Sequence, residues 1–528
     1  MKHLLFLIFA VQACLPGFAA CDGRVRIVPR PAEVEELPGS FRLTPRTPVV
    51  ITDERLRTPA EIFARAVGKL TGTEPAVTAV PEKHAVTLHL QPGYEAEEYL
   101  LEVGRQRITV TASTPQAVLH GLRSLQQLVA GGEIPACVVR DKPTFAYRGA
   151  MLDVCRHFFP VEDVKTYIDI LSLHKINKFH WHLTDDQGWR IEIKKYPLLT
   201  QIGSRRAETL VGRYDKNKEG VYDGKPYGGF YTQEEIREIV SYAAERHIEV
   251  IPEIEMPGYG LAALTAYPWL GCTGGPYAVW THWGISDDVY CAGKETTFEF
   301  IEKVLTEVLA LFPSKLIHIG GDECPKGRWK ACPLCQQRIR EEGLKDEYQL
   351  QSYFIHRIER WMHAHGREII GWDEILQGGI SKTANIMSWN GSDPGIKAAQ
   401  RGNPVIMTPK WYCYFDYSQT SDPERYEPLG NTRYVSVRQA YRLDPCDRLT
   451  LPDQKRIRGV QCNLWTEYIA DIRHAQHMVL PRMAALAETG WANDRKDYND
   501  FVRRIPALVA VYKAEGYNYA PYLFEGIE

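Results

Sequence analysis

The chain has 528 residues, 44% of them hydrophobic, which is enough for one large domain and a smaller one, each with its own core. A formal net charge of −3 at pH 7 gives no general attraction for nucleic acid or for an anionic membrane, so we expect no nucleic-acid partner. Aromatic residues make up 11% of the chain, which suits sugar-stacking surfaces, although most aromatic side chains fill cores. The composition indicates a globular enzyme or binding protein.

The first twenty residues have the pattern of an export signal. A basic start precedes the apolar stretch Leu4 to Val11, which is too short to anchor the chain across a membrane. Phe18-Ala19-Ala20-Cys21 resembles a bacterial lipobox, with Phe18 in place of the usual Leu. We therefore expect a lipid anchor at Cys21 and a periplasmic, outer-membrane or cell-surface lipoprotein of a bacterium. A plain secretory signal is the alternative.

Residues 22–143 alternate short β-type runs with helical patterns, which predicts a small α+β domain. No cluster of acids or histidines follows its strands, so a supporting role is expected. The composition turns polar at Asp141-Lys142-Pro143, which marks the domain boundary. The expected strands include Ala85–Leu90, Tyr99–Val103 and Arg107–Thr111, and the expected helices are Pro59–Leu70 and Pro115–Val129.

Residues 144–500 repeat a strand followed by a helix, which predicts a (β/α)₈ TIM barrel. The segment between the seventh and eighth strands reads mostly as loop, and residues 501–528 are expected to form an extension that packs on the barrel. The expected strands are Tyr147–Asp153, Lys178–Leu183, Ile248–Ile254, Lys315–Ile319, Glu368–Trp372, Asn385–Trp389, Val405–Pro409 and Gly459–Leu464. The expected helices are Val161–His174, Gln233–Arg246, Thr297–Leu311, Tyr348–His365, Pro394–Arg401 and Ile472–Glu488.

Acidic and aromatic residues follow nearly every one of these strands, where a TIM barrel has its active site. After the fourth strand, Gly320 and Gly321 lead into Asp322 and Glu323. An isolated Asp-Glu pair is more often a solvated turn, but here the other strand ends carry the same residue types. Acids accept hydrogen bonds from hydroxyls and indoles cover the apolar face of a sugar, so the pattern favours a neutral, ring-shaped, polyhydroxylated ligand.

Metal binding is the rival use of such acids. His182 and His318 lie on different strands without a recognisable set of supporting residues, so we expect no metal or cofactor. Cys332-Pro-Leu-Cys335 has the spacing of a zinc or redox motif, but no second pair matches it. We therefore favour disulfides, because exported proteins meet an oxidising environment. The candidates are Cys272–Cys291 and a bond within the group Cys324, Cys332 and Cys335.

Six stretches in series resemble the β-N-acetylhexosaminidases of glycoside hydrolase family 20. They span nearly the whole predicted barrel in the family's order, and a preceding α+β domain is also the family's habit. The resemblance implies exo-acting release of terminal β-linked GlcNAc or GalNAc from glycans, with retention at the anomeric carbon and attack by the sugar's own acetamido oxygen. The six stretches are Arg148–Asp153, His180–Arg190, Pro252–Gly258, His318–Glu323, Gly371–Glu374 and Asn463–Glu467.

The resemblance also implies roles for single residues. Glu323 would be the general acid and then the base, Asp322 would orient the acetamido nitrogen and stabilise its charge, and Tyr414 would hold the acetamido oxygen. This division requires a protonated Glu323 beside an ionised Asp322, so their pKa values should differ. The implied substrate-binding residues are Trp372, Trp389 and Trp465 as walls, Arg148 and Glu467 for the C3 and C4 hydroxyls, Asp416 for the C6 hydroxyl, and Asp185 and His182.

One position departs from the family's pattern. Tyr259 follows Pro257-Gly258 where the family commonly has a His that joins the catalytic acid, which affects the tuning of Glu323 rather than the reaction class. Two alternatives remain at this stage. One is a catalytically silent glycan-binding protein, and the other is a conventional retaining glycosidase in which Glu467 or Asp416 is the nucleophile. The preference between GlcNAc and GalNAc, the natural glycan and the oligomeric state stay open.

Overall fold

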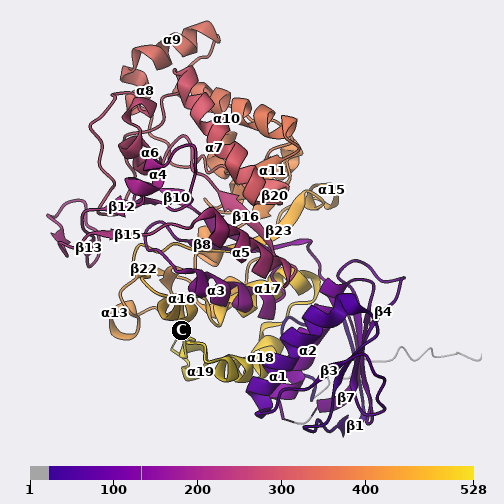
Figure 1. Ribbon diagram of the computed structural model, residues 1–528. Helices are drawn as coiled ribbons and strands as arrows, with labels where there is room; N and C mark the ends of the chain where they lie inside the picture. The colour runs from indigo at the N-terminus through magenta and orange to yellow at the C-terminus, as the bar shows by residue number, and fades with distance from the viewer. Residues whose placement is uncertain (1–22, 133, 528) are drawn as a thin grey trace, which may run out of the picture.

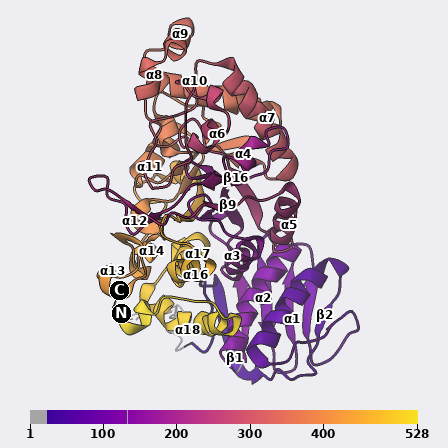
Figure 2. The same cartoon turned by 60° about the vertical axis from the view of Figure 1, so that its left-hand side comes forward.

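The computed structural model describes residues 23–132 and 134–527 (Figure 1). The expected export signal and Cys21 lie outside these residues. A smaller N-terminal domain packs against one end of a larger barrel, and the view in Figure 2 separates the two. Within the described ranges, no helix is both long enough and apolar enough to cross a membrane.

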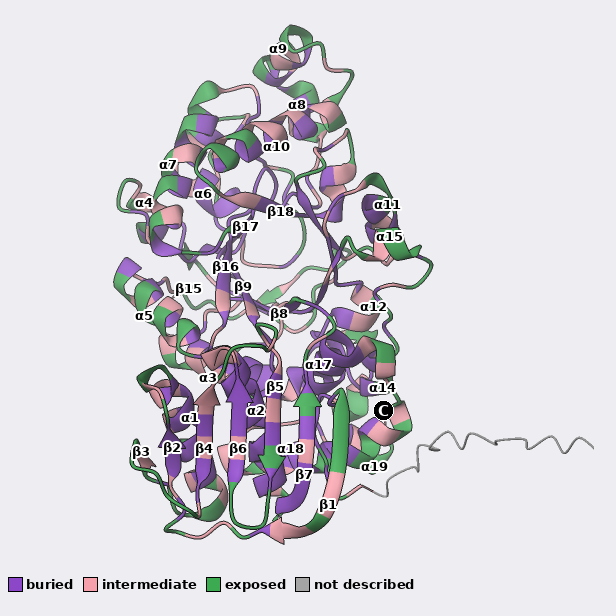
Figure 3. Ribbon diagram, turned by 90° about the vertical axis from the view of Figure 1, so that its right-hand side faces the viewer, coloured by how far each residue is buried: buried purple, intermediate pink, exposed green. Residues whose placement is uncertain are grey.

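The N-terminal domain is one sheet with two helices, α1 (Arg57–Thr71) and α2 (Pro115–Ala130), between the sheet and the barrel (Figure 1). Along the central strands the burial alternates, because only the face under the helices is covered: Tyr99 and Leu101 are buried while Glu102 is exposed (Figure 3). In spatial order the strands are β1 (Glu33–Phe41), β7 (Ile134–Asp141), β5 (Tyr99–Val103), β6 (Ile108–Ala112), β4 (Val86–Leu90), β2 (Val49–Ile51) and β3 (Val77–Thr78).

The second domain is a closed barrel of eight parallel strands, which confirms the predicted fold. Each predicted strand is present, with ends that differ by at most two residues. Continuous apolar runs mark them because both faces of a barrel strand are buried. The strands are β8 (Tyr147–Asp153), β9 (Lys178–His182), β16 (Glu249–Glu253), β17 (Leu316–His318), β18 (Glu368–Trp372), β19 (Asn385–Ser388), β20 (Val405–Met407) and β23 (Ile457–Leu464).

Helices surround the barrel in the predicted order, with one correction. The helix expected over 472–488 is two helices, α16 (Ile472–Val479) and α17 (Arg482–Ala492), because Pro481 has no N–H to continue the hydrogen-bond ladder. The segment after β20 is also more ordered than expected, since it contains the small strand pair β21 (Tyr417–Ser418) and β22 (Asn431–Tyr434). The other main barrel helices are α3 (Val161–Leu173), α5 (Gln233–Ala244), α7 (Glu295–Leu311), α10 (Glu347–Ala364) and α11 (Asp393–Arg401).

The C-terminal helix α18 (Tyr498–Glu515) lies between the two domains rather than on the barrel alone. It contacts both α1 and α2 of the N-terminal domain, as Figure 1 shows. On the barrel side, the Tyr512 hydroxyl lies 2.6 Å from Nε2 of His174. The extension that was expected on the barrel therefore packs on the N-terminal domain as well.

All ten cysteines of the described residues are free. The expected bond between Cys272 and Cys291 is not formed, and Cys324 stands apart from Cys332 and Cys335 in the sulfur contacts. Instead, Cys272 and Cys291 lie beside Cys332 and Cys335. The sequence-based pairing is wrong for this structure, because sequence distance does not reveal which loops meet.

Candidate active site

The acids and aromatic residues at the strand ends meet in one cavity of about 220 Å³. It lies at the carboxyl ends of the barrel strands, which is the functional end of this fold. The volume is below the range of about 300–1,000 Å³ that suits drug-sized ligands, and it matches a ligand the size of one sugar ring. The lining residues are Arg156, Asp185, Glu255, Tyr259, Asp322, Glu323, Trp389, Lys410, Tyr414, Asp416, Tyr417, Asn431, Arg433, Trp465 and Glu467.

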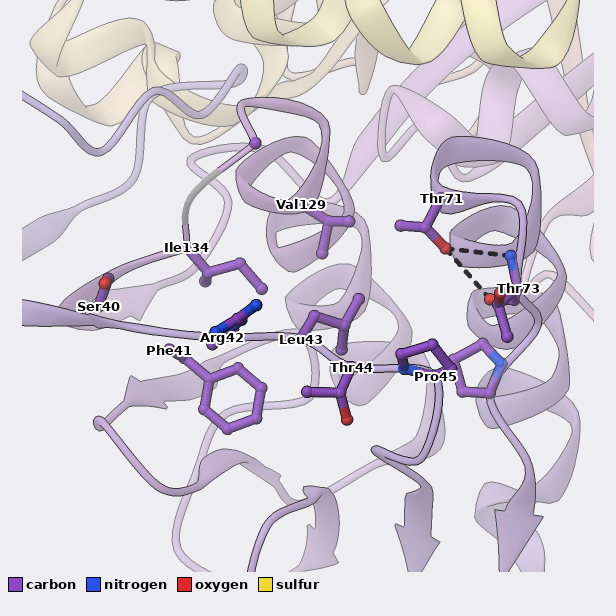
Figure 4. Close-up of a pocket in the computed structure, with 12 residues that line it drawn as sticks. Ser40, Phe41, Arg42, Leu43, Thr44, Pro45, Thr71, Thr73, Val129 and Ile134 are labelled. Carbon is purple, nitrogen blue, oxygen red and sulfur yellow. Dashed lines mark hydrogen bonds between the residues drawn. The ribbon is translucent and has the colours of Figure 1, made fainter.

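A larger cavity of about 570 Å³ lies in the N-terminal domain (Figure 4). Its lining comes from 40–45, from Thr71, Thr73 and Pro75, and from the end of α2 and the start of β7. None of the described residues that line it carries a carboxylate or an imidazole, and its short polar contacts join Thr71 to the Thr73 backbone. The described lining offers no group for acid–base chemistry, so the smaller cavity at the barrel strand ends is the candidate active site.

The strand β17 delivers Asp322 and Glu323 to the cavity through two glycines. Gly320 and Gly321 have φ angles of 68° and 96°, a region that favours glycine. At Gly320 a Cβ atom would also lie 1.7 Å from Oε2 of Glu255, so a side chain has no room there. Glu323 itself has a φ of 41°, which a non-glycine residue rarely adopts. The tight turn thus brings both acids and Glu255 to one point.

Asp322 is buried, and its charge has little compensation in the pocket. Burial raises its pKa well above the ordinary value, and the nearby carboxylates of Glu374 and Glu323 raise it further. Among the described residues, no group donates a hydrogen bond to its Oδ1 atom. The direction is opposite to that of the ionised Asp322 that the family resemblance implies, so an ionised Asp322 in this pocket needs a positive partner.

Tyr259 lies beside Glu323. Its hydroxyl donates a hydrogen bond to Oε2 of Glu323, and its ring lies 5.7 Å from the guanidinium carbon of Arg156. The Tyr259 side chain is almost fully buried, so burial raises its pKa well above 10, and the charge of Glu323 adds to the shift. Tyr259 therefore stays neutral, and its hydroxyl remains a hydrogen-bond donor to Glu323. An unperturbed histidine, by contrast, titrates near neutral pH.

Three aromatic rings form one wall of the cavity. Trp389 and Tyr414 stack with ring centres 5.9 Å apart, and Tyr414 lies 6.4 Å from Trp465. Trp372 has no exposed surface and does not line the cavity; it lies behind Trp465, with ring centres 5.9 Å apart. Its indole N–H donates to Glu253 at 2.9 Å. The expected aromatic wall is present, with Trp372 as its support.

Arg156 lines the pocket and Arg148 does not. Arg148 is the second residue of β8, at the end of the barrel that faces the N-terminal domain, where it pairs with Glu97. Arg156 follows the carboxyl end of the same strand, and its guanidinium lies 3.0 Å from Asp185 and 3.2 Å from Asp153. The assignment of Arg148 to substrate binding is corrected. The strand β8 is seven residues long, so Arg148 near its start lies at the opposite end of the barrel from the cavity.

His182 does not line the cavity but contacts Asp185, which does. Its Nε2 atom lies 2.8 Å from Asp185, and its Nδ1 atom bonds to Glu253. Burial would lower the pKa of His182, but the carboxylates of Glu253 and Asp185 raise it to about 10. The charged imidazolium and Arg156 hold Asp185 in place, so His182 is a supporting residue and Asp185 is the group exposed to the cavity.

Further polar groups of the cavity come from the segment after β20, which includes Asp416, and from Glu467 after β23. Burial raises the pKa of Asp416 well above its ordinary value, with Glu467 adding to the shift, and Asn431 donates a hydrogen bond of 3.3 Å to Asp416. Lys410 lies 4.6 Å from the Trp389 ring centre and Arg433 also lines the cavity. These groups can bind the hydroxyls of a sugar ring.

Models of two protein families match the chain. "Glycosyl hydrolase family 20, catalytic domain" matches residues 145–494, and "Glycosyl hydrolase family 20, domain 2" matches residues 24–142. The first match alone covers more than half of the chain. The chain belongs to glycosyl hydrolase family 20. It is therefore a glycoside hydrolase by family.

Relatives of this family-20 enzyme cover nearly its whole length. A beta-hexosaminidase of Porphyromonas gingivalis is 41% identical over 98% of this chain and 68% of its own. A beta-hexosaminidase of Vibrio furnissii is 38% identical over 88% of this chain and 76% of its own. Among solved structures, the exo beta-N-acetylglucosaminidase of Vibrio harveyi in complex with N-acetylglucosamine has a TM-score of 0.83 and 31% identity, covering 94% of this chain and 78% of the other.

The family-20 enzyme also has pocket residues that the sequence analysis missed. Arg156 could have been found, because it stands three residues beyond the predicted end of the first barrel strand. Lys410 directly follows the seventh predicted strand. Tyr417, Asn431 and Arg433 belong to the segment read as loop, and no sequence signal placed them at the cavity.

Proposed function

We propose that this enzyme is an exo-acting β-N-acetylhexosaminidase that removes terminal, non-reducing β-linked GlcNAc or GalNAc with retention, by substrate-assisted catalysis. One observation carries the proposal: Asp322, with a buried Oδ1 atom that accepts no hydrogen bond from a described residue, directly precedes Glu323 in a cavity the size of one sugar ring. Tyr414 lies close enough that the charge of Asp322 contributes to its raised pKa. The three groups required by the mechanism thus face one small volume.

The proposed reaction has two steps. In the first, the acetamido oxygen bonds to the anomeric carbon, the bond from that carbon to the leaving oxygen breaks, and Glu323 gives its proton to the leaving oxygen. The cyclic oxazolinium that results carries a positive charge beside Asp322. In the second step, water adds to the anomeric carbon and loses a proton to Glu323 while the acetamido group re-forms.

The electrostatics of the pocket support a cationic intermediate. Glu374, Glu323 and Glu253 all raise the pKa of Asp322, after the larger effect of burial, because their charges oppose a further negative charge. The same negative potential stabilises a cation that forms next to the buried Asp322, where screening is weaker than in bulk water. By linkage, a cation at this point lowers the pKa of Asp322, so the charge on each favours the other.

The first test is a panel of 4-nitrophenyl β-glycosides. We expect release from the GlcNAc or GalNAc derivative and none from the glucoside and galactoside, which lack the acetamido group. Release from the glucoside at a comparable rate would contradict acetamido participation. Binding of N-acetylglucosamine without release from any substrate would instead support the silent glycan-binding alternative.

A second test separates the two retaining mechanisms. A GlcNAc-thiazoline, which mimics the cyclic intermediate, should inhibit strongly, and Asp322→Asn should weaken its binding. A 2-fluoro glycoside should leave no covalent adduct in the mass of the intact protein. An ester-linked sugar on Glu467, Asp416 or another carboxylate would favour the conventional two-carboxylate mechanism.

The proposed site of action is outside the cytoplasm, on the surface of a bacterial membrane. This proposal rests on the sequence of the first 21 residues alone. Growth with a labelled fatty acid should label the wild-type protein, and Cys21→Ala should abolish the label. An unlabelled wild-type protein in the culture medium would support a plain secretory signal.

A further inference from the structure

Four cysteines meet at one point outside the active-site cavity. Cys272 and Cys291 belong to the loop after β16, which includes the short 3₁₀ helix η2 (Pro268–Leu270). Cys332 and Cys335 lie where α8 (Gly327–Ala331) meets α9 (Pro333–Glu341), in the loop after β17. The four Sγ atoms all lie within 4.8 Å of one another.

The distances between the sulfur atoms are those of metal ligands. Cys291 lies 3.6 Å from Cys335 and 3.8 Å from Cys332, and Cys272 lies 3.9 Å from Cys335. A disulfide would require about 2.05 Å. Four thiolates about 2.3 Å from a central zinc ion, at the corners of a tetrahedron, lie about 3.8 Å apart. Cys291 and Cys335 each have two close sulfur neighbours, so the contacts link all four sulfur atoms into one group.

The surrounding chain holds this arrangement in place. A Cβ atom at Gly293 would lie 2.3 Å from the backbone of Leu334, so glycine lets the segment after Cys291 approach the turn between Cys332 and Cys335. The Trp329 indole donates a hydrogen bond of 2.9 Å to the Tyr290 carbonyl, which ties the two loops together next to the cluster. Cys291 and Cys335 have no exposed surface. The cluster is therefore a built feature of the two loops.

We propose that Cys272, Cys291, Cys332 and Cys335 bind one structural Zn²⁺ ion. Four sulfur ligands with tetrahedral spacing are the donor set of closed, structural zinc sites. On binding, the ion replaces the thiol protons, so one Zn²⁺ is taken up and up to four H⁺ are released, with no change in oxidation state. With four protein ligands the ion has no open position, so its role is to join the loops.

The site connects two loops that also carry catalytic groups. Tyr259 lies in the loop after β16, six residues beyond Glu253, and Glu323 lies in the loop after β17, five residues beyond His318. A zinc ion between these loops would hold their outer parts together and so limit how far Tyr259 and Glu323 move apart. The proposal does not depend on the substrate, because metal content is measured without any turnover.

The sequence analysis did not expect this site. Cys332 and Cys335 have the spacing of a zinc motif, but the partners come from 41 and 63 positions away, Cys291 to Cys332 and Cys272 to Cys335. Neither partner is part of a second short motif. β16 and β17 are neighbouring strands of the barrel, so the loops that follow them lie side by side. This brings Cys272 and Cys291 to Cys332 and Cys335.

Metal analysis of the whole chain tests the proposal. The protein is produced without a metal-affinity tag, in medium that contains zinc, and is dialysed against a weak chelator. We expect one zinc ion per chain by plasma mass spectrometry. Cys335→Ser and Cys272→Ser should lose the zinc, whereas Cys446→Ser, a partly exposed cysteine outside the cluster, should retain it. Replacement by Co²⁺ should give the absorption spectrum of a tetrahedral thiolate site.

Several outcomes would overturn the proposal. A folded wild-type chain with no zinc would do so, as would another metal in its place. Peptides joined by a disulfide between any two of the four cysteines, in the unreduced digest of freshly purified protein, would show that oxidation replaces metal binding. If Cys335→Ser does not fold, the wild-type metal content and the partly buried Cys272→Ser still decide the question.

Discussion

At the end of the barrel that faces the N-terminal domain, buried charges are paired with opposite charges. Arg148 bonds to Glu97, and Lys175 lies 3.2 Å from Asp141 with neither side chain exposed. Burial alone would raise the pKa of Glu97, but Arg148 and His120 hold it well below its usual range. At the carboxyl end, by contrast, burial and neighbouring acids raise the pKa of Asp322.

The two ends of the barrel therefore use buried charges differently, one for stability and the other for the proposed chemistry. Paired charges satisfy each other and hold the two domains together, although the desolvation penalty limits what they add to stability. Unpaired acids cost the folded state free energy, and in the proposed mechanism they lie where a positive charge develops. Removal of a charge should therefore have opposite effects at the two ends, and four predictions test this comparison.

The largest effect is expected for Glu323→Gln. Turnover of a substrate with a poor leaving group should fall by about 10²–10⁴-fold, because general acid catalysis is lost. An activated aryl glycoside, whose leaving group needs no proton, should lose much less. The measurement is kcat on a GlcNAc disaccharide and on a dinitrophenyl glycoside. Equal loss on both would contradict the role of Glu323 as acid.

Asp322→Asn should lower kcat by about 10²–10³-fold, since a neutral amide stabilises a developing cation poorly. The same change should not lower the melting temperature at pH 7. The pKa of Asp322 is higher in the folded chain than its value of 3.8 without the fold, so ionisation above that pH opposes folding. Calorimetry at pH 5 and pH 8 checks this point. A clear loss of stability at pH 8 would show that Asp322 is compensated.

Arg148→Met, at the opposite end, should lower the free energy of unfolding by about 3–5 kcal/mol, because Glu97 is left buried and unpaired. In the wild type the lowered pKa of Glu97 stabilises the fold above its ordinary value of 4.5, and this contribution is lost as the pH falls. The variant should lack that part of the acid dependence, while kcat of the folded enzyme stays unchanged.

The matched control is Arg156→Met in the pocket. It should lower kcat/KM by about 10–100-fold, as expected for loss of a charged hydrogen bond to substrate. Denaturant unfolding and kinetics are measured on both variants. If Arg148→Met reduced kcat as strongly as Arg156→Met, the two ends would not be functionally separate.

The smallest effect is expected for Tyr259→Phe, which removes one hydrogen bond to Glu323 without a large change in volume. We expect kcat to fall by about 3–10-fold, in line with about 0.5–1.5 kcal/mol for one hydrogen bond. Measurement of kcat for the wild type and the variant checks this prediction. An unchanged kcat would mean that the hydrogen bond from Tyr259 does not assist Glu323.

The barrel could be predicted from the sequence because each strand is a continuous apolar run that ends in acids or aromatic residues. The same rule located Asp322, Glu323, Trp389, Trp465 and Glu467, which all line the cavity. It failed for Arg148, since family motifs give residue order but not the end of the strand on which a side chain lies. Arg156, three residues past Asp153, was the residue at the correct end.

Other features depend on contacts between distant segments, which no local pattern reveals. Asn431 and Arg433 reach the cavity only because β22 pairs with β21 in the segment after β20. The cysteine cluster needs two loops that neighbouring strands bring together. The break at Pro481 was a local signal, but the amphipathic pattern on both sides of it favoured a single helix.

The position of α18 bears on how the chain reaches its final form during synthesis. Arg504 in this helix donates hydrogen bonds to the Ile27 carbonyl at 2.7 Å and to Glu488 at 2.9 Å and 2.6 Å. The segment around Ile27 therefore gains this hydrogen-bond partner only after Arg504 has been synthesised. Until residues 498–515 emerge, the helices of the first domain lack one of the surfaces that cover them. A chain cut short before α18 should therefore expose α1 and α2 to proteases.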